Sequence, residues 1–329
     1  MKQVGTNQSS AQTRAAAGLR SLFRNQGITM LLILVVMWVV LAFLSPYFFT
    51  VDNLFEITLQ TAVIAIIAVG ETLVIISGGI DLSVGSVFAC AAVVGGLVFT
   101  STGNLLLALA TTLGVGALLG LTNGLLISKV RVPPFIATLG MMGIARGLAL
   151  IISSGIPIYG LDDNFKFIGQ GKFFDVIPVP TVIVLVVYAV AYGVMNYTRF
   201  GRFVYAIGSN AEAARLSGIN VPLVIIGIYT ISGLMSGLAY TIEAGRLATI
   251  QPAGGNGYEL LAIGAVLIGG ASTFGGEGSI LATLIGALLV TTIRNGLNIL
   301  GVNAFWQYVV NGVVIIAAVA IDQYRRRRS

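Results

Sequence analysis

Stretches of uncharged, apolar residues recur from about residue 28 almost to the C-terminus, and they constrain the fold more than any other feature of this sequence. The first of them, 28–44, contains no Asp, Glu, Lys or Arg. A helix that crosses a bilayer needs about 20 predominantly apolar residues. Of the 329 residues, 57% are hydrophobic and 9% are charged, whereas a soluble domain averages about 45–50% and about 25%. The sequence therefore predicts one membrane domain and no separate soluble domain.

The expected membrane spans are charge-poor runs that end at polar residues, glycine or proline. The ten runs are 28–45, 57–76, 87–101, 104–127, 135–153, 179–197, 222–242, 259–271, 279–298 and 304–321. The run 259–271 is too short to cross unaided, so it either continues into its flanks or re-enters the bilayer. The predicted fold class is all-α, a polytopic membrane helix bundle of about ten transmembrane helices with broken or re-entrant elements. We expect an N-terminal tail, 1–27, a transmembrane domain, 28–321, and a basic C-terminus, 322–329.

The distribution of basic residues predicts the orientation of this bundle. With the N-terminus inside, 13 of the 18 Lys and Arg residues fall on the cytoplasmic side, and cytoplasmic loops are the ones enriched in these residues. We therefore expect both termini in the cytoplasm, with the arginines 325–328 acting as a topology anchor and not as a nucleic-acid site. The longest external segments are then 154–178 and 243–258, where an external partner would dock.

Glycines spaced by four residues mark several of these spans. The sets are Gly116, Gly120 and Gly124, then Gly143 and Gly147, then Gly233 and Gly237. This spacing leaves a smooth strip along one helix face, which allows two helix backbones to approach closely in a membrane. We expect helix packing from these strips.

The residue inventory disfavours an enzyme embedded in the membrane. The chain has no histidine, which removes the usual general base and the commonest metal ligand. Cys90 is the single cysteine and lies in an apolar segment without metal-type neighbours. A phosphate-binding G-x-x-x-x-G-K-[ST] motif is missing, since Gly171-Lys172 is followed by Phe173. We therefore expect no metal site and no ATP hydrolysis on this chain.

Two breaks between spans carry unusual polar sequence. In the first, Asp81 lies among glycines and serines between apolar runs, and its carboxylate is expected either to cap the next helix or to act in gating or coupling. A related pattern occurs twice, because 73–86 resembles 265–279. Transporters are often built from such repeats, with sites where helices break.

The second break, 208–219, predicts a short helix on the cytoplasmic side. Ser209 or Asn210 is expected to cap it, Glu212 to lie in its first turn and Gly218 to end it. A helix this short is marginal alone, so we expect it to rest against another structure.

These motifs resemble those of a known family. Glu212-Ala213-Ala214 followed by Gly218 resembles the cytoplasmic coupling motif of bacterial ABC importer permeases, and 79–86 is similar to the signature of their monosaccharide branch. Further segments that resemble ribose-type permeases are 135–139, 199–202, 251–252, 257–260 and 295–298. The resemblance covers nearly the whole chain after the tail.

The resemblance implies a transmembrane subunit of an ATP-driven importer in the bacterial inner membrane. Two permease subunits, expected to be two copies of one chain, would form the pathway for a ribose-like pentose or related sugar. A periplasmic or surface binding protein would deliver the sugar, and separate cytoplasmic ATPase subunits would use ATP and Mg²⁺. No cofactor is expected on this chain, and its other surroundings are membrane lipid.

The resemblance also assigns candidate site residues. The contacts expected with the ATPase are Glu212, Ala213, Ala214, Arg215 and Gly218, and the signature or gating residues are Gly79, Asp81, Ser83, Gly85 and Ser86.

Polar side chains inside the spans are candidates for a translocation path. They are Gln60, Glu71, Thr138, Asn295 and Asn298, with Asn123 as a further one. Single polar residues also hold helices together, and a charge inside a span needs a reason. One reason for Glu71 would be a pair with Arg146.

Two alternative functions remain open at this stage. The chain could be a permease for another small solute, such as a branched-chain amino acid or a nucleoside. It could also be an ion-coupled secondary transporter, for which Glu71 is the one plausible intramembrane carboxylate.

Overall fold

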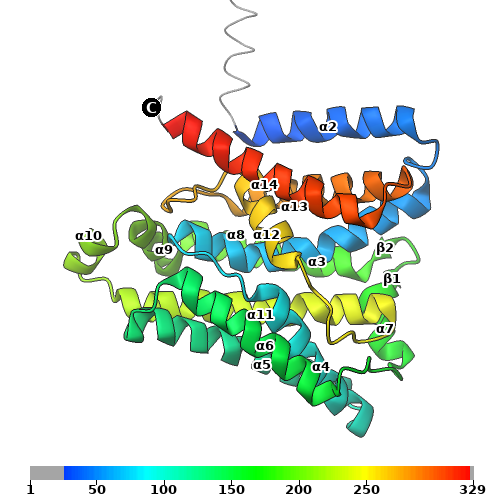
Figure 1. The fold of residues 1–329 in the computed structure, drawn as a ribbon, viewed down its shortest axis with the longest axis horizontal. Coiled ribbons are helices and arrows are strands. Elements are labelled where there is room, and N and C mark those ends of the chain that lie inside the picture. Colours follow the sequence, from blue (N-terminus) through cyan, green and yellow to red (C-terminus); the bar gives the residue numbers. More distant parts are fainter. Residues whose placement is uncertain (1–25, 327–329) are drawn as a thin grey trace, which may run out of the picture.

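The computed structural model describes residues 26–326 (Figure 1). The predicted N-terminal tail, 1–27, lies almost wholly outside the described residues, as do almost all side chains of the basic C-terminus, 322–329. Each of the ten expected apolar runs forms a helix. These helices are α2 (Gln26–Leu44), α3 (Val51–Ile76), α4 (Val84–Thr102), α5 (Leu105–Leu125), α6 (Pro134–Ser153), α8 (Val179–Tyr197), α11 (Val221–Leu247), α12 (Tyr258–Ile268), α13 (Ile280–Ile299) and α14 (Ala304–Arg326).

Short elements connect the long helices. They are the π-helical turn η1 (Leu126–Val130), the helices α7 (Asp163–Gln170), α9 (Arg199–Ser209) and α10 (Ala211–Leu216), and an antiparallel hairpin of β1 (Lys172–Phe173) and β2 (Ile177–Pro178). The loop expected at 154–178 therefore contains α7 and the hairpin.

Seven helices in the described part of the chain are long and apolar enough to cross a membrane. They are α3, α4, α5 continued by η1, α6, α8, α11 and α13. The prediction of an all-α polytopic membrane protein is confirmed. The shortest apolar helix, α12, has 11 residues, which span about 16 Å. It ends at residue 268, so the expected run 259–271 does not extend to the length of the hydrocarbon core, about 30 Å.

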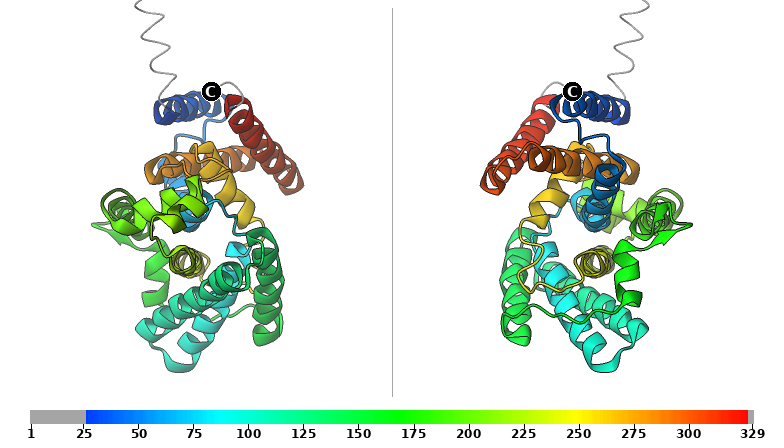
Figure 2. Two further views of the ribbon diagram at one scale, coloured as in Figure 1. Left: turned by 90° about the vertical axis from the view of Figure 1, so that its left-hand side faces the viewer. Right: turned by 90° about the vertical axis from the view of Figure 1, so that its right-hand side faces the viewer.

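The helix α3 forms the centre of the bundle. All its residues from Thr61 to Ile76 are buried, as expected for a helix that is apolar on every side. It packs against α8, α11, α12 and α13. Figure 2 shows α2, α13 and α14 on one side of this centre and α4, α5 and α6 on the other.

Close glycine contacts join α5 to α11. A Cβ atom at Gly116 would overlap the carbonyl oxygen of Gly233, and one at Gly120 would overlap that of Tyr229. At Gly124 it would lie 2.7 Å from the Cα of Ile226. The prediction that these strips serve helix packing is confirmed for this pair of helices.

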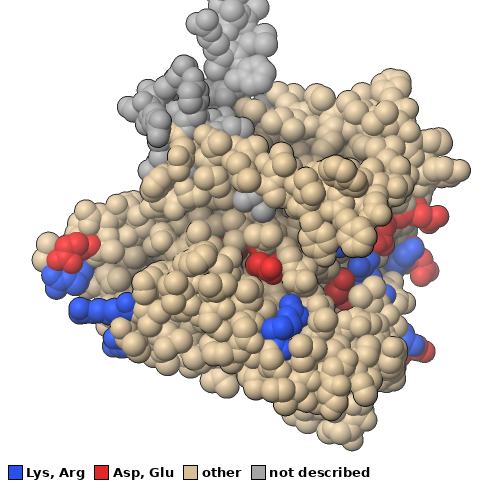
Figure 3. Space-filling view, viewed as in Figure 1, with Lys and Arg blue, Asp and Glu red and all other residues tan. Residues whose placement is uncertain are grey.

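The two ends of the bundle differ in their elements. Figure 1 shows α9 and α10 at one end, and α7 with the hairpin at the other. In the same view α2 runs away from the α10 end and α14 returns towards it. Charged residues gather at both ends, and a broad face with few charges lies between them (Figure 3).

Candidate functional site

The helix α10 forms an exposed tip at one end of the bundle (Figure 1). Its cap is Asn210, whose side-chain oxygen accepts a hydrogen bond from the backbone N–H of Ala213 at 2.9 Å. The turn after it ends at Gly218, where φ is 85°, a left-handed conformation that glycine adopts without steric cost. The helix is shorter than the predicted range 209–219, because Ser209 is still part of α9 and Asn210 alone provides the cap.

The side chains of α10 are exposed apart from that of Ala214. Glu212 and Arg215 form an ion pair on this surface, with Nε of the arginine 3.0 Å from Oε2 of the glutamate. The hydrogen bond from Arg215 holds the pKa of the Glu212 carboxyl below its ordinary value. Leu216, 74% exposed, follows directly in the sequence. The helix thus offers one ion pair and one apolar side chain to a partner.

The C-terminal end of α9 packs backbone to backbone against the end of α3. A Cβ atom at Gly208 would overlap the carbonyl oxygen of Ile76. That carbonyl also accepts a hydrogen bond from the N–H of Gly276 at 2.8 Å. The hydroxyl of Tyr205 donates to the carbonyl of Gly278 at 2.9 Å. We call the contacts among these five residues the α9 junction.

The α9 junction connects α10 to both loops of the internal repeat. Ile76 is the last residue of α3 and directly precedes the loop 77–83, and Gly276 and Gly278 lie in the loop 269–279. A Cβ atom at Gly275 would lie 2.9 Å from the carbonyl oxygen of Gly208 and 3.0 Å from backbone atoms of Gly78. Hardly any side chain intervenes, so α9 packs directly against both loops.

Asp81 lies in the loop 77–83, and both oxygens of its carboxylate accept hydrogen bonds from serine. Its Oδ1 accepts from the backbone N–H and the hydroxyl of Ser83 at 2.9 and 2.6 Å, and its Oδ2 accepts from the hydroxyl of Ser232 on α11 at 2.9 Å. Asn123 on α5 donates its amide to the Ser83 hydroxyl at 2.9 Å. Asp81 therefore binds the residue that precedes α4 and not, as the sequence suggested, the free N–H groups of that helix.

The glycines of the signature segment are required by close neighbours. A Cβ atom at Gly79 would overlap the hydroxyl of Tyr229, and one at Gly85 would overlap the carbonyl oxygen of Gly255 and the carboxylate of Glu259. The start of α4 therefore touches the irregular segment that leads into α12. Ser86 is buried in the first turn of α4, where its N–H donates to the carbonyl of Ser83 at 2.9 Å.

The loops 77–83 and 269–279, the α9 junction and the exposed α10 all lie within the part of the chain that matches a known protein family. Residues 53–319 match the family described as the permease component of the branched-chain amino acid transport system. The chain belongs to this permease family. It is thus a transport component and not an enzyme.

Curated relatives of this permease carry sugar names. The ribose import permease of Escherichia coli K12 is 45% identical over 300 residues, which cover 90% of this chain and 93% of that protein. The ribose import permease of Bacillus subtilis 168 is 43% identical over 293 residues, 88% of this chain and 90% of that protein. The D-allose transport system permease of Escherichia coli K12 is 40% identical over 300 residues, 88% and 90% respectively.

The five candidate path residues lie at separate places in the permease. Thr138 donates to the carbonyl of Ile80 at 3.2 Å, and Glu71 accepts from the N–H of Asp81 at 3.2 Å, so these two join the signature loop. The other three bind polar neighbours elsewhere: Gln60 to Glu56 at 2.8 Å, Asn295 to Asn53 at 2.7 Å and Asn298 to Gln307 at 2.6 Å.

The considered pair between Glu71 and Arg146 is not formed. The Arg146 guanidinium instead donates to the carbonyls of Pro252 and Gly254, at 3.1 and 2.8 Å. These carbonyls lie in the irregular segment 248–257, where no helix supplies partners and buried polar backbone must find one.

A charged cluster at the end opposite α10 was missed by sequence reasoning. Arg246 donates to Glu56 at 2.6 Å and to Glu243 at 3.1 Å, and the hydroxyl of Tyr258 donates to Glu243 at 3.2 Å. We call Glu56, Glu243, Arg246 and Tyr258 the charged cluster. The spacing of Glu243 and Arg246 by three residues was its one visible signal.

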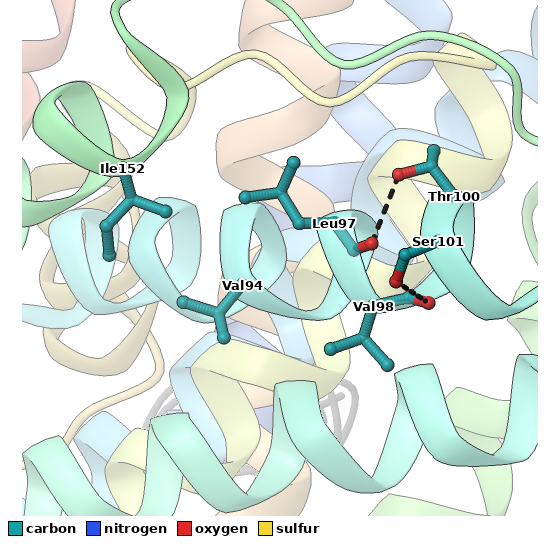
Figure 4. A pocket seen from close by; sticks show the side chains of 6 residues that line it. All are labelled: Val94, Leu97, Val98, Thr100, Ser101 and Ile152. Carbon is teal, nitrogen blue, oxygen red and sulfur yellow. Dashed lines mark hydrogen bonds between the residues drawn. The ribbon is translucent and has the colours of Figure 1, made fainter.

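The open pocket between α4 and α6 does not suit a sugar (Figure 4). Its volume is about 540 Å³, and its lining is mostly aliphatic. The hydroxyls of Thr100 and Ser101 turn back onto the carbonyls of Leu97 and Val98 in the same helix, at 3.1 Å each. No ring of polar groups faces this space among its lining residues.

Proposed function

We propose that this chain is the multi-pass permease subunit of an ATP-driven importer in the bacterial inner membrane, which translocates a monosaccharide such as ribose or a related sugar. The observation that carries the proposal is that the exposed α10 is joined through the α9 junction to the loops 77–83 and 269–279. The chain in which this arrangement occurs is 45% identical to a ribose import permease. The sugar-named relatives do not favour the branched-chain amino acid alternative.

In the proposed orientation the α10 end faces the cytoplasm. The bundle then has ten crossings, of which α12 is only partial, with the tail 1–27 and the basic C-terminus 322–329 inside and the permease domain 28–321 between them. Two observations support this. Cytoplasmic segments carry most of the basic residues, and α2 leaves the α10 end while α14 returns to it (Figure 1).

The proposed role of α10 is to receive the motion of a separate ATPase subunit. The ion pair of Glu212 and Arg215, together with Ala213, would contact a groove of the ATPase, while buried Ala214 and the turn at Gly218 would hold α10 on the bundle. ATP and Mg²⁺ would be used by that subunit, since no phosphate-binding motif occurs here. Closure of the ATPase pair would push α9 against Ile76 and the loop 269–279, and so move the start of α4.

The proposed second permease is another copy of this chain. In support, a Cβ atom at Gly140, Gly143 or Gly147 of α6 would meet no atom of the described residues within 4 Å. This glycine strip is open, whereas those of α5 and α11 are filled by each other. The sugar path would run near the signature loop, with Thr138 and Glu71 close to it; Gln60, Asn295 and Asn298 would act nearer the other end.

The proposed delivery partner is a periplasmic or surface sugar-binding protein. It would dock at the end that carries α7, the hairpin and the charged cluster, which is opposite α10 (Figure 1). That end presents the helix 163–170 and exposed charges to an external protein.

The decisive experiment is uptake by proteoliposomes that contain the permease and an importer ATPase subunit of the same organism, supplied with a sugar-binding protein of that organism. We expect labelled ribose to enter only with the binding protein outside and ATP and Mg²⁺ inside. Unlabelled allose and arabinose serve as competitors in the same assay. Uptake that continues without ATP and collapses with an ion gradient would establish a secondary transporter instead. Uptake of leucine but not of any sugar would move the chain to the amino acid branch.

A further inference from the structure

In the interior of the bundle, next to the signature loop, the carboxyl group of one buried acidic residue contacts the backbone of another. Glu71 on α3 is 0% exposed and Asp81 is 1% exposed. The Oε1 atom of Glu71 accepts a hydrogen bond from the backbone N–H of Asp81 at 3.2 Å. This contact holds the returning loop 77–83 against the helix that it has just left.

No described Lys or Arg pairs with either carboxyl group. The ion pairs formed in the described part of the chain involve other acids, namely Asp163, Glu212, Glu56 and Glu243. Two adjacent ionised carboxylates without a cation would be very costly at this depth, because burial disfavours each charge and the like charges repel.

The hydrogen bonds around the two groups distinguish them. Asp81 accepts three hydrogen bonds, two from Ser83 and one from Ser232. An ionised carboxylate is an acceptor only, and several donors stabilise its charge. Asp81 therefore has the surroundings of an ionised group.

Glu71 has the opposite surroundings. Its Oε2 atom is buried and has no partner among the described residues. Two further buried oxygens near the loop are unpartnered there as well, the hydroxyl of Tyr229 and Oδ1 of Asn123. The Tyr229 hydroxyl faces the loop at Gly79, two residues before Asp81, so that a Cβ atom there would overlap it. None of the described donors, the Tyr229 hydroxyl included, forms a hydrogen bond with Oε2 of Glu71. An oxygen without donors favours the protonated, uncharged form of its carboxyl group.

We infer that Glu71 and Asp81 together bind one proton, which resides on Glu71, so that the pair carries a single negative charge. The protonated carboxyl of Glu71 is then uncharged, and Asp81 keeps its three donors. This inference concerns the interior of the bundle and does not depend on the transported solute. The bound proton keeps the loop 77–83 attached to α3, because loss of the proton would set two like charges against each other at that contact.

Infrared spectroscopy of the full chain in lipid nanodiscs tests the inference. A protonated carboxylic acid has a C=O stretch above the amide I band, which a carboxylate lacks. At pH 7.5 we expect such a band in the native protein. It should shift when glutamate is labelled with ¹³C at its carboxyl carbon and stay in place when aspartate is labelled. This comparison needs no substitution, so a folding failure cannot obscure it.

Matched variants locate the proton. The band should disappear in Glu71→Gln and persist in Glu243→Gln, which alters a carboxylate paired with Arg246. In Asp81→Asn the band should remain but be lost at a lower pH than in the native protein, since the neighbouring negative charge is gone.

Three results would overturn the inference. The first is a native spectrum without the band. The second is a band that shifts with aspartate labelling, which would place the proton on Asp81. The third is a band that appears only when sodium and potassium are replaced by choline, because a metal cation would then occupy the site in place of the proton.

Discussion

The α9 junction and the charged cluster occupy opposite ends of the same bundle and are built from different contacts. At the α9 junction, Gly208 meets the carbonyl of Ile76 with no side chain between them. In the charged cluster, the long side chains of Arg246, Glu243 and Glu56 hold α11 to α3. The first end is held mainly by main chain against main chain, with the Tyr205 hydroxyl as its one side-chain hydrogen bond, and the other is held by side chain against side chain.

This difference suggests how each end responds to force. Closely packed backbones have no soft degrees of freedom, so they move together or separate. Ion pairs between long side chains reorient over several ångströms and exchange with water at modest cost. We therefore expect the α9 junction to transmit motion from α10, and the charged cluster to rearrange as the opposite end opens and closes.

The largest expected effect comes from filling the α9 junction. In Gly208→Ala the new methyl group collides with the carbonyl of Ile76, so α9 must move away from α3. We expect the protein to lose about 1–3 kcal/mol of unfolding free energy and its sugar uptake to fall more than tenfold. Thermal unfolding in detergent and uptake by proteoliposomes measure the two effects.

The matched control is Gly193→Ala on α8, where a Cβ atom would meet nothing within 4 Å in the described part of the chain. It should leave stability unchanged or slightly raise it, because alanine is the better helix former. If Gly208→Ala and Gly193→Ala had the same stability and uptake, the α9 junction would accommodate the added methyl group. The expected difference in rigidity between the two ends of the bundle would then be wrong.

The next effect separates coupling from folding. Glu212→Ala removes the exposed ion pair of α10, and we expect at least a tenfold loss of ATPase copurification and of uptake. Stability and the amount of protein in the membrane should stay the same, since exposed ion pairs contribute little. Pull-down of the ATPase and thermal unfolding measure these quantities.

Asp163→Ala is the control for this variant. It breaks a pair with Lys166 that has the same spacing in a short helix, at the other end of the bundle. ATPase binding should be unaffected there. If both variants or neither lose the ATPase, α10 is not the specific contact.

A smaller effect is expected from the charged cluster. In Arg246→Gln, Glu243 loses its cation while its side chain stays 9% exposed. We expect a loss of about 1–2 kcal/mol, less than for a fully buried pair because Glu56 is partly exposed, and uptake reduced only a few fold. The double variant Arg246→Gln with Glu243→Gln should recover part of the stability, and calorimetry of the three proteins tests this. A loss of uptake as complete as in Gly208→Ala would mean that this end is also rigid.

The helices could be predicted from the sequence more fully than their ends. Apolar runs find helices because a membrane span must be apolar along its length. The same rule placed the start of α3 at residue 57 and the end of α11 at residue 242, although these helices reach Val51 and Leu247. The extra turns carry Glu56 and Arg246, which look like loop residues until their pairing across 190 positions is known.

The candidate site was predictable only where chemistry leaves a local pattern. The cap, acidic first turn and terminal glycine of α10 follow one another within the segment 208–219, so the sequence indicated a helix there. The contact between Gly208 and Ile76 joins residues far apart and uses main-chain atoms, which any residue supplies. Nothing in the sequence distinguishes Gly208 from a glycine with free space around it, such as Gly193.

The smallest effect is expected from acid acting on α10. The hydrogen bond from Arg215 lowers the pKa of Glu212 in the folded protein, while a free glutamate titrates near pH 4.3. The stabilisation from this pair is therefore fully present above about pH 4.3 and is lost only as the pH falls through the lower folded value. We expect the ATPase retained by the immobilised permease to be constant from pH 8 to pH 5. Glu212→Gln should retain less at every pH, with the same flat profile. If retention instead rises steeply as the pH falls from 8 to 5 in the native protein but not in Glu212→Gln, the carboxylate must titrate against an acidic residue of the ATPase, because a like charge raises its pKa in the complex. In that event Arg215 would not be its partner in the complex, and α10 would need to rearrange its side chains, as we expect of the charged cluster.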